Sequence, residues 1–145
     1  MKKLLITLFA LTTTVFAAEG WLTDYETALA KAKEAKNPVL VVFSGSDWCP
    51  PCKKLDKEIL ASTEFREAMK GGKFVPLFLD FPRQKEIPAE QKKKNEALSK
   101  KFNITGFPTV LLLDADGKTL ARQSGLRWQS TKEFLEWIEK SVKKD

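Results

Sequence analysis

A chain of 145 residues favours one domain, and it is long enough to close an apolar core without disulfide staples. The composition, 43% hydrophobic and 30% charged, is ordinary for a soluble globular protein. The formal net charge of +6 raises the question of a nucleic-acid partner. However, the lysines at 92–94 and 100–101 form no patch with interleaved aromatic residues. We therefore expect a solvated helix face there, and no nucleic-acid binding.

The N-terminus resembles a secretory signal. Lys2 and Lys3 precede an apolar run from Leu4 to Leu11, and small residues follow at Ala17. We predict a signal peptide over residues 1–17, cleavage before Ala18, and a mature domain of residues 18–145 that is periplasmic or secreted. An uncleaved membrane anchor is the alternative, although the run falls short of the roughly 20 residues that span a bilayer.

The first elements are a helix and a buried strand. Thr23 and Glu26 have the spacing of a capping box, and apolar residues then recur at helical spacing, so we predict a helix over Thr23–Lys36. Asn37-Pro38 ends it. Val39–Phe43 is an unbroken apolar run, as in a strand that is covered on both faces.

The middle of the chain carries two more helices and a second strand. A loop from Ser44 leads into a helix that begins at the cysteines, and a further helical stretch runs up to Gly71-Gly72. Phe74–Asp80 is predicted to be a strand, and Pro76 within it indicates a sheet edge.

The C-terminal part of the chain is predicted to contain a helix, two strands and a last helix. Residues 81–90 are irregular, and a basic helix, two strands around an Asp-Gly turn, and a capped helix follow. The expected segments are Gln91–Phe102, Val110–Leu113, Asp116-Gly117, Thr119–Gln123, a Ser130/Glu133 capping box, and a last helix with Phe134, Leu135, Ile138 and Val142 on its apolar face. The order predicts an α/β fold with a right-handed parallel βαβ unit and an antiparallel hairpin. The central sheet is mixed, with four strands, or five as the alternative, and is flanked by helices.

Cys49 and Cys52 are separated by two residues at the start of a predicted helix. Only a thiolate attacks a disulfide, and the unpaired N–H groups at a helix N-terminus favour that anion. We expect Cys49, nearest the helix opening, to be the nucleophile and Cys52 to resolve the mixed disulfide. A complete Cys/His zinc site within one chain is excluded because the chain has no His and no third Cys, although a site shared by two chains is not. An inert structural disulfide is the other alternative.

The segment Trp48-Cys49-Pro50-Pro51-Cys52-Lys53 resembles the Trp-Cys-x-x-Cys-Lys motif of thioredoxins. Residues 102–109, Phe-Asn-Ile-Thr-Gly-Phe-Pro-Thr, resemble the family's second signature, and Gly125-Leu126 also matches. The resemblance covers about residues 38–144 and implies a thioredoxin-like fold. It implies that Pro108 is cis and opposes Cys49, that the backbone of Phe107 pairs with a substrate peptide, and that Trp48 flanks the groove. A core aromatic is the alternative for Trp48.

The chain also departs from the thioredoxin pattern. The strand before the motif lacks the usual buried acid, since it reads Val41-Val42-Phe43. Asp47 is either a proton relay or, as we expect, a solvated loop acid. The stretch Phe81–Lys94 resembles an insertion.

Together these features predict an exported thiol–disulfide oxidoreductase that reduces protein disulfides. It needs no cofactor and no metal. The expected partners are disulfide-containing protein substrates and a membrane electron donor, and the expected state is a monomer. The alternatives are a disulfide oxidase or isomerase, or a non-enzymatic binding or assembly module with a structural disulfide. The reducing direction follows from Pro50-Pro51, which supplies neither a charge nor an N–H donor to the Cys49 thiolate.

Overall fold

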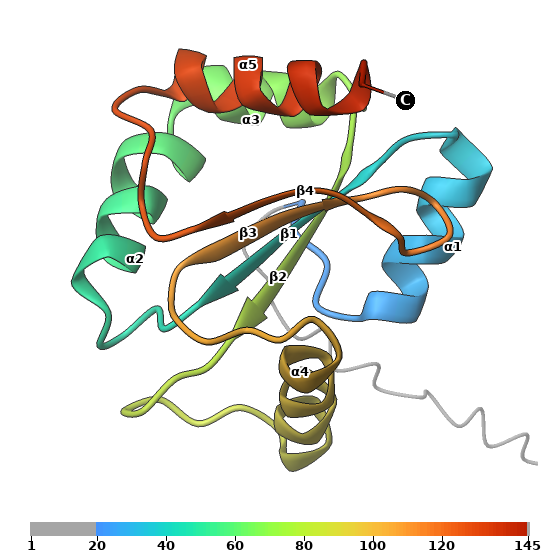
Figure 1. The fold of residues 1–145 in the computed structure, drawn as a ribbon. Coiled ribbons are helices and arrows are strands. Elements are labelled where there is room, and N and C mark those ends of the chain that lie inside the picture. The colour runs from blue at the N-terminus through green and yellow to red at the C-terminus, as the bar shows by residue number, and fades with distance from the viewer. Residues whose placement is uncertain (1–19, 145) are drawn as a thin grey trace, which may run out of the picture.

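The computed structural model describes residues 20–144 (Figure 1). The predicted signal peptide over residues 1–17 lies outside them. The elements in chain order are α1 (Tyr25–Ala35), β1 (Val39–Ser44), α2 (Pro50–Leu55), a π-helical turn η1 (Asp56–Leu60), α3 (Thr63–Lys70), β2 (Val75–Asp80), α4 (Ala89–Lys101), β3 (Thr109–Leu113), β4 (Thr119–Ser124) and α5 (Thr131–Val142).

The four strands form one mixed sheet in the order β2-β1-β3-β4. β1 pairs with β2 in parallel and with β3 antiparallel, and β3 pairs antiparallel with β4. The mixed α/β sheet that the sequence predicts is therefore confirmed. In place of a fifth strand, Leu22 makes an isolated parallel bridge to Leu77 on the outer side of β2.

Pro76 lies on the edge strand, as predicted, and the pairing explains why it is tolerated there. Its carbonyl accepts the N–H of Leu22 on the outer side of β2. The N–H that proline lacks would point to this same outer side, so the ladder to β1 loses no hydrogen bond.

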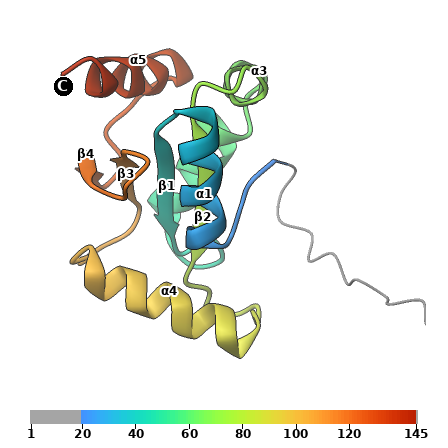
Figure 2. The same ribbon diagram turned by 90° about the vertical axis from the view of Figure 1, so that its right-hand side faces the viewer.

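Helices cover the sheet on both faces, which explains the unbroken apolar run of β1. Leu40 and Val42 face a core built with α2, η1, α3 and α5, whereas Val39, Val41 and Phe43 face a core built with α1 and α4. Figure 2 shows α3 and α5 on one side of the strands and α4 on the other. Because both faces are buried, every residue of β1 is excluded from solvent.

Two predicted helix details are wrong. The N-cap of α1 is Asp24 and not Thr23: the Asp24 carboxylate accepts the backbone N–H and the hydroxyl of Thr27, which lowers the pKa of that carboxyl. At the end of α5, Val142 is 41% exposed and Ser141 is buried instead. At α5 the predicted N-cap is confirmed, since Ser130 Oγ accepts the Glu133 N–H. The Glu133 carboxylate accepts the N–H of Gln129, one residue before the N-cap, in place of the Ser130 N–H of a complete capping box.

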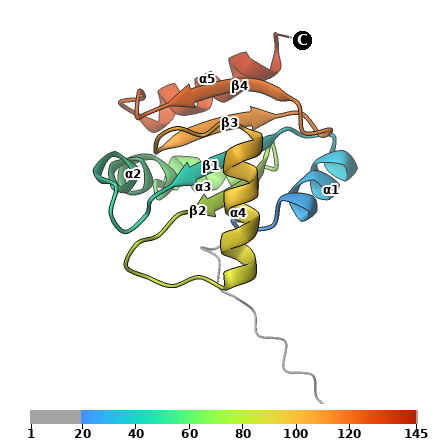
Figure 3. The same ribbon diagram turned by 60° about the horizontal axis from the view of Figure 1, so that its bottom comes forward.

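Three loops meet at one end of the sheet. In the register of the strands, Ser44 at the end of β1 lies beside Asp80 at the end of β2, and Thr109 at the start of β3 lies opposite Phe43. The segments after Ser44, after Asp80 and before Thr109 therefore leave the sheet together. Figure 3 shows the loop from β2 to α4 projecting on the same side as the loop from β1 to α2.

Candidate active site

Gly45 organises the turn that leads from β1 to the cysteines. Its carbonyl accepts the N–H groups of Trp48 (3.2 Å) and Cys49 (2.9 Å), and its own N–H points at Cys52 Sγ, 3.4 Å away. A side chain does not fit at this position, because a Cβ atom on Gly45 would lie 2.5 Å from the Trp48 indole. The Trp48 indole thus packs directly against the backbone of Gly45, which closes the turn.

Cys49 and Cys52 form a disulfide at the start of α2, with their Cα atoms 5.2 Å apart. Cys49 is the N-cap residue, and Pro50 and Pro51 occupy the first turn, where proline removes no helical hydrogen bond. Both cysteines are buried, with exposed fractions of 3% and 2%. Lys53, the nearest cation along the chain, is exposed.

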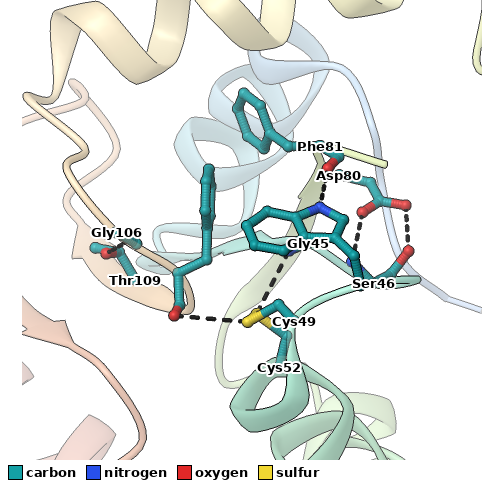
Figure 4. Close-up of a disulfide and its surroundings, with 10 residues drawn as sticks. Gly45, Ser46, Cys49, Cys52, Asp80, Phe81, Gly106 and Thr109 are labelled. Carbon is teal, nitrogen blue, oxygen red and sulfur yellow. Dashed lines mark hydrogen bonds between the residues drawn. A yellow bond between two sulfur atoms is a disulfide. The ribbon is translucent and has the colours of Figure 1, made fainter. Parts of the chain in front are cut away.

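The segment before β3 lies against the disulfide. The Phe107–Pro108 peptide bond is cis, and the Phe107 carbonyl oxygen is 3.6 Å from Cys49 Sγ. Figure 4 shows the segment that carries Gly106 and Thr109 beside Cys49. The Pro108 carbonyl accepts the N–H of Gly125, and the Thr109 hydroxyl donates to the Gly106 carbonyl. These bonds fix the segment on both sides of the cis bond. Within the described part of the chain, the Phe107 N–H has no hydrogen-bond acceptor.

Trp48 is half-buried beside the disulfide and forms an aromatic cluster with two other segments. Its ring centroid lies 5.9 Å from that of Phe107, and Phe107 in turn lies 5.0 Å from Phe81. The Trp48 indole N–H donates to the Phe81 carbonyl at 2.7 Å. Arg83 covers the outer face of the indole, with its guanidinium carbon 3.6 Å from the ring centroid.

Asp47 anchors the loop that carries Phe81 and Arg83. Its carboxylate accepts the backbone N–H groups of Arg83 (3.0 Å), Gln84 (2.8 Å) and Lys85 (2.8 Å). These hydrogen bonds, that of Arg83 first, lower the pKa of Asp47 to about 2. Its hydrogen bonds reach this loop and neither cysteine, so Asp47 is a loop acid with a structural task.

A cleft of about 540 Å³ lies beside the cysteine turn, between β2 and the start of α4. Asp80 lines it, accepts from the backbone and hydroxyl of Ser46, and pairs with Lys85 at 2.8 Å. Asp56 also lines it: although the residue is exposed overall, partial burial raises the pKa of its carboxyl. Asn95 closes the inner end and donates to the Asp80 carbonyl.

The structure brings together all the residues that the sequence singled out: Trp48, Cys49, Cys52, Phe107 and Pro108. Sequence reasoning missed Gly45, Phe81, Arg83 and Asp80. The signals available were a glycine four residues before Cys49 and the inserted stretch after β2, neither of which specifies a contact. In residues 20–144, no cluster of His, Cys, Asp or Glu side chains has the make-up of a metal site. No helix in that range is long and apolar enough to cross a membrane.

The fold and the site define a class of protein. The thioredoxin-like domain family matches residues 25–141, and the chain therefore belongs to that family. Among curated relatives, the disulfide bond reductase DsbH of Chlamydia pneumoniae is 38% identical over 108 residues, which are 74% of this chain and 64% of the relative. The thioredoxin-related protein DsbJ of the same organism is 40% identical over 102 residues, or 70% of this chain and 29% of the relative. The chain thus spans less than two thirds of either protein.

Solved structures agree with this assignment. A DsbH oxidoreductase superposes with a TM-score of 0.76 at 33% identity, covering 86% of this chain and 85% of that one. The reduced C-terminal domain of Neisseria meningitidis DsbD superposes with a TM-score of 0.57 at 26% identity, covering 80% of this chain and 92% of that one.

Proposed function

We propose that this chain is an exported thiol–disulfide oxidoreductase that reduces disulfides in proteins. The observation that carries the proposal is the Cys49–Cys52 disulfide at the start of α2, with the cis Phe107–Pro108 segment 3.6 Å from the Cys49 sulfur. Membership of the thioredoxin-like family and similarity to a disulfide bond reductase support it.

In the reduced protein, the Cys49 thiolate attacks one sulfur of a substrate disulfide and expels the other substrate sulfur as a thiolate. A mixed disulfide between Cys49 and the substrate results. The Cys52 thiolate then attacks Cys49 Sγ, forms the Cys49–Cys52 disulfide and releases the second substrate thiol. The substrate gains two electrons and two protons, and the enzyme dithiol becomes a disulfide.

Phe107 supports the binding of an extended peptide beside the cysteines. Its N–H has no acceptor in the described part of the chain, and its carbonyl faces the disulfide. Backbone groups of this kind pair with the backbone of an added strand. Trp48 and Phe107 would then flank the substrate cysteine.

The surroundings of Cys49 favour the reducing direction. Pro50 and Pro51 offer no N–H group and no charge to a thiolate, and the Phe107 carbonyl accepts a hydrogen bond from a thiol but repels an anion. Because of both effects, the Cys49 thiolate, and with it the reduced form, is less stabilised than in a strong oxidase. The disulfide is then harder to reduce, so the reduced enzyme is a better reductant. We expect a Cys49 pKa nearer the roughly 7 of thioredoxin than the ~3.5 of the strongest oxidases.

The activity is tested with two cysteine variants. Reduced wild-type protein should reduce insulin, and Cys49→Ser should abolish this reaction. Cys52→Ser should accumulate mixed disulfides, because the resolving thiol is missing. If both variants reduce insulin as fast as wild type, the pair is not the active site.

The direction is tested by the reduction potential of the pair against glutathione. A reduction potential of about −270 mV supports a reductase, whereas one of about −120 mV marks an oxidase and contradicts the proposal. Pro51→His should raise the potential, because a cation in the dipeptide stabilises the Cys49 thiolate.

Export and electron supply complete the proposal. Residues 1–17 resemble a signal peptide, which supports a mature protein in the periplasm or outside the cell. Electrons would then come from a membrane partner, because the periplasm is kept oxidising. Mass spectrometry of protein from the native envelope should find Ala18 at the N-terminus, and retention of Met1 would contradict cleavage.

A further inference from the structure

Arg83 stands out among the charged residues near the disulfide because its position is fixed although its side chain is exposed. Its guanidinium carbon lies 3.6 Å from the centroid of the Trp48 ring. Trp48 precedes Cys49 directly and packs edge-on against Phe107, whose carbonyl faces the Cys49 sulfur. The positive charge of Arg83 is therefore linked to the Cys49 site through a single side chain, that of Trp48.

The backbone of Arg83 is held from two sides. The Asp47 carboxylate accepts its N–H and those of the next two residues, and the Phe81 carbonyl accepts the Trp48 indole N–H. Lys85 pairs with Asp80 on the cleft side of the same loop. These contacts keep the loop against the indole, and the stacked ring restricts the guanidinium to one plane.

The charges around Arg83 leave its donors available. Asp47 is occupied by backbone N–H groups, and Asp80 by Ser46 and Lys85. Within residues 20–144, no carboxylate forms an ion pair or a hydrogen bond with the Arg83 side chain. A guanidinium stacked on an aromatic ring keeps the N–H fork at its edge free, and this fork matches a carboxylate.

We propose that Arg83 is a specificity-determining residue that favours disulfide substrates carrying a carboxylate next to the reactive cysteine. This inference rests on the proposed function. The aromatic cluster of Trp48, Phe81 and Phe107 provides an apolar wall that accepts many side chains, and Arg83 adds a charge at its rim. Substrates with Glu or Asp beside the cysteine gain an ion pair there, whereas substrates with Lys or Arg meet a like charge.

The test uses two short peptide disulfides that differ only in Glu or Gln beside the cysteine. Stopped-flow measurement at low ionic strength gives the second-order rate constant of each with the reduced protein. The Glu peptide should react about threefold to fivefold faster with wild type, the range of a partly exposed ion pair. The ratio should fall to about one in Arg83→Gln and below one in Arg83→Glu, and it should shrink as salt is added.

Lys118→Gln is the matched control. It removes the same charge from the hairpin loop at the opposite end of β3 and should leave the Glu/Gln ratio unchanged. An unchanged ratio in Arg83→Gln, or an equal loss in Lys118→Gln, would overturn the inference, because net charge and not Arg83 would then set any preference.

A binding measurement separates this inference from the proposed function. The two peptides are remade with Ser in place of Cys, and their affinities for the oxidised protein are measured by titration calorimetry. Tighter binding of the Glu peptide by wild type, lost in Arg83→Gln, supports the inference even if no peptide disulfide is reduced. Equal affinities of wild type for the two peptides would contradict it, whatever the activity.

Discussion

The segments Ser44–Trp48 and Phe81–Lys85 lie side by side at one end of the sheet, but different forces hold them. The first contains Gly45, which is buried and has no room for a Cβ atom against the Trp48 indole. The second is exposed at Arg83, Gln84 and Lys85, and there it is held by the Asp47 carboxylate and by the ion pair of Lys85 with Asp80.

This difference separates the framework of the cysteine pair from the loop that borders it. Close packing is insensitive to pH and salt, whereas hydrogen bonds to a carboxylate disappear when that carboxylate is protonated. The second segment can therefore loosen while the first keeps the cysteines in place. Substitutions in the two segments should differ in size and in pH dependence.

The largest effect is expected for Gly45→Ala. The new Cβ atom would lie 2.5 Å from the indole, so Trp48 has to move and its hydrogen bond to the Phe81 carbonyl is strained or lost. Such overpacking costs about 1–3 kcal/mol, and the cost should be the same at pH 4 and pH 7. Chemical denaturation followed by circular dichroism measures it.

Gly106→Ala is the matched control on the other side of the disulfide. A Cβ atom there meets nothing within 4 Å, and Gly106 is not among the described glycines with positive φ. Its free energy of unfolding should stay within about 0.5 kcal/mol of wild type. Equal destabilisation by the two substitutions would show that the contact with Trp48 is not the cause.

The first segment was also the more predictable from sequence. The apolar run of β1, the cysteine spacing and the helical periodicity after it are local patterns, and they located the strand, the helix start and the cysteine pair. The contacts of Asp47 join residues 36 to 38 positions apart, and no local pattern specifies them. The sequence drew attention to the stretch Phe81–Lys94, but not to the packing of Phe81 and Arg83 near Trp48.

The smaller errors have local causes. Thr23 and Asp24 are adjacent residues that both favour N-cap positions, so the sequence alone did not decide between them. The π-helical turn at Asp56–Leu60 has no sequence signal that the helical period would detect. At the end of α5 the buried residue is Ser141 and not its neighbour Val142. The Ser141 hydroxyl donates to the Trp137 carbonyl.

Asp47→Asn should loosen the segment Phe81–Lys85 without moving the segment Ser44–Trp48. The folded-state pKa of Asp47 is about 2, below the ordinary 3.8, so its stabilising contribution is complete above about pH 4 and is lost as the pH falls towards 2. At pH 6 the amide protons of Arg83, Gln84 and Lys85 should exchange on the order of tenfold faster in the variant.

The control for Asp47→Asn is the same change on the hairpin loop. The Asp116 carboxylate accepts no described backbone N–H and has only a distant contact with Lys33, 3.9 Å away. Asp116→Asn should leave exchange in the 83–85 segment unchanged. Wild-type and Asp47→Asn stabilities that differ as much at pH 2 as at pH 6 would show that the carboxylate charge does not hold the loop.

The smallest effect is expected for Asp56→Asn, and its sign is opposite. Partial burial of the Asp56 carboxyl at the cleft raises its pKa, while the positive charge of Lys85 lowers it in part. A raised folded-state pKa means that the ionised form is less favoured in the folded protein, so Asp56 lowers stability once the pH rises above its ordinary value of 3.8. Removing the charge should therefore stabilise the protein at pH 7, by less than about 1 kcal/mol because solvent screens the site.

At pH 3 both the wild-type carboxyl and the amide are neutral, and the two proteins should unfold at the same temperature. Thermal unfolding at both pH values tests this. A variant that is less stable than wild type at pH 7 would mean that the ionised Asp56 contributes favourably, through its attraction to the charge of Lys85, and would contradict the prediction.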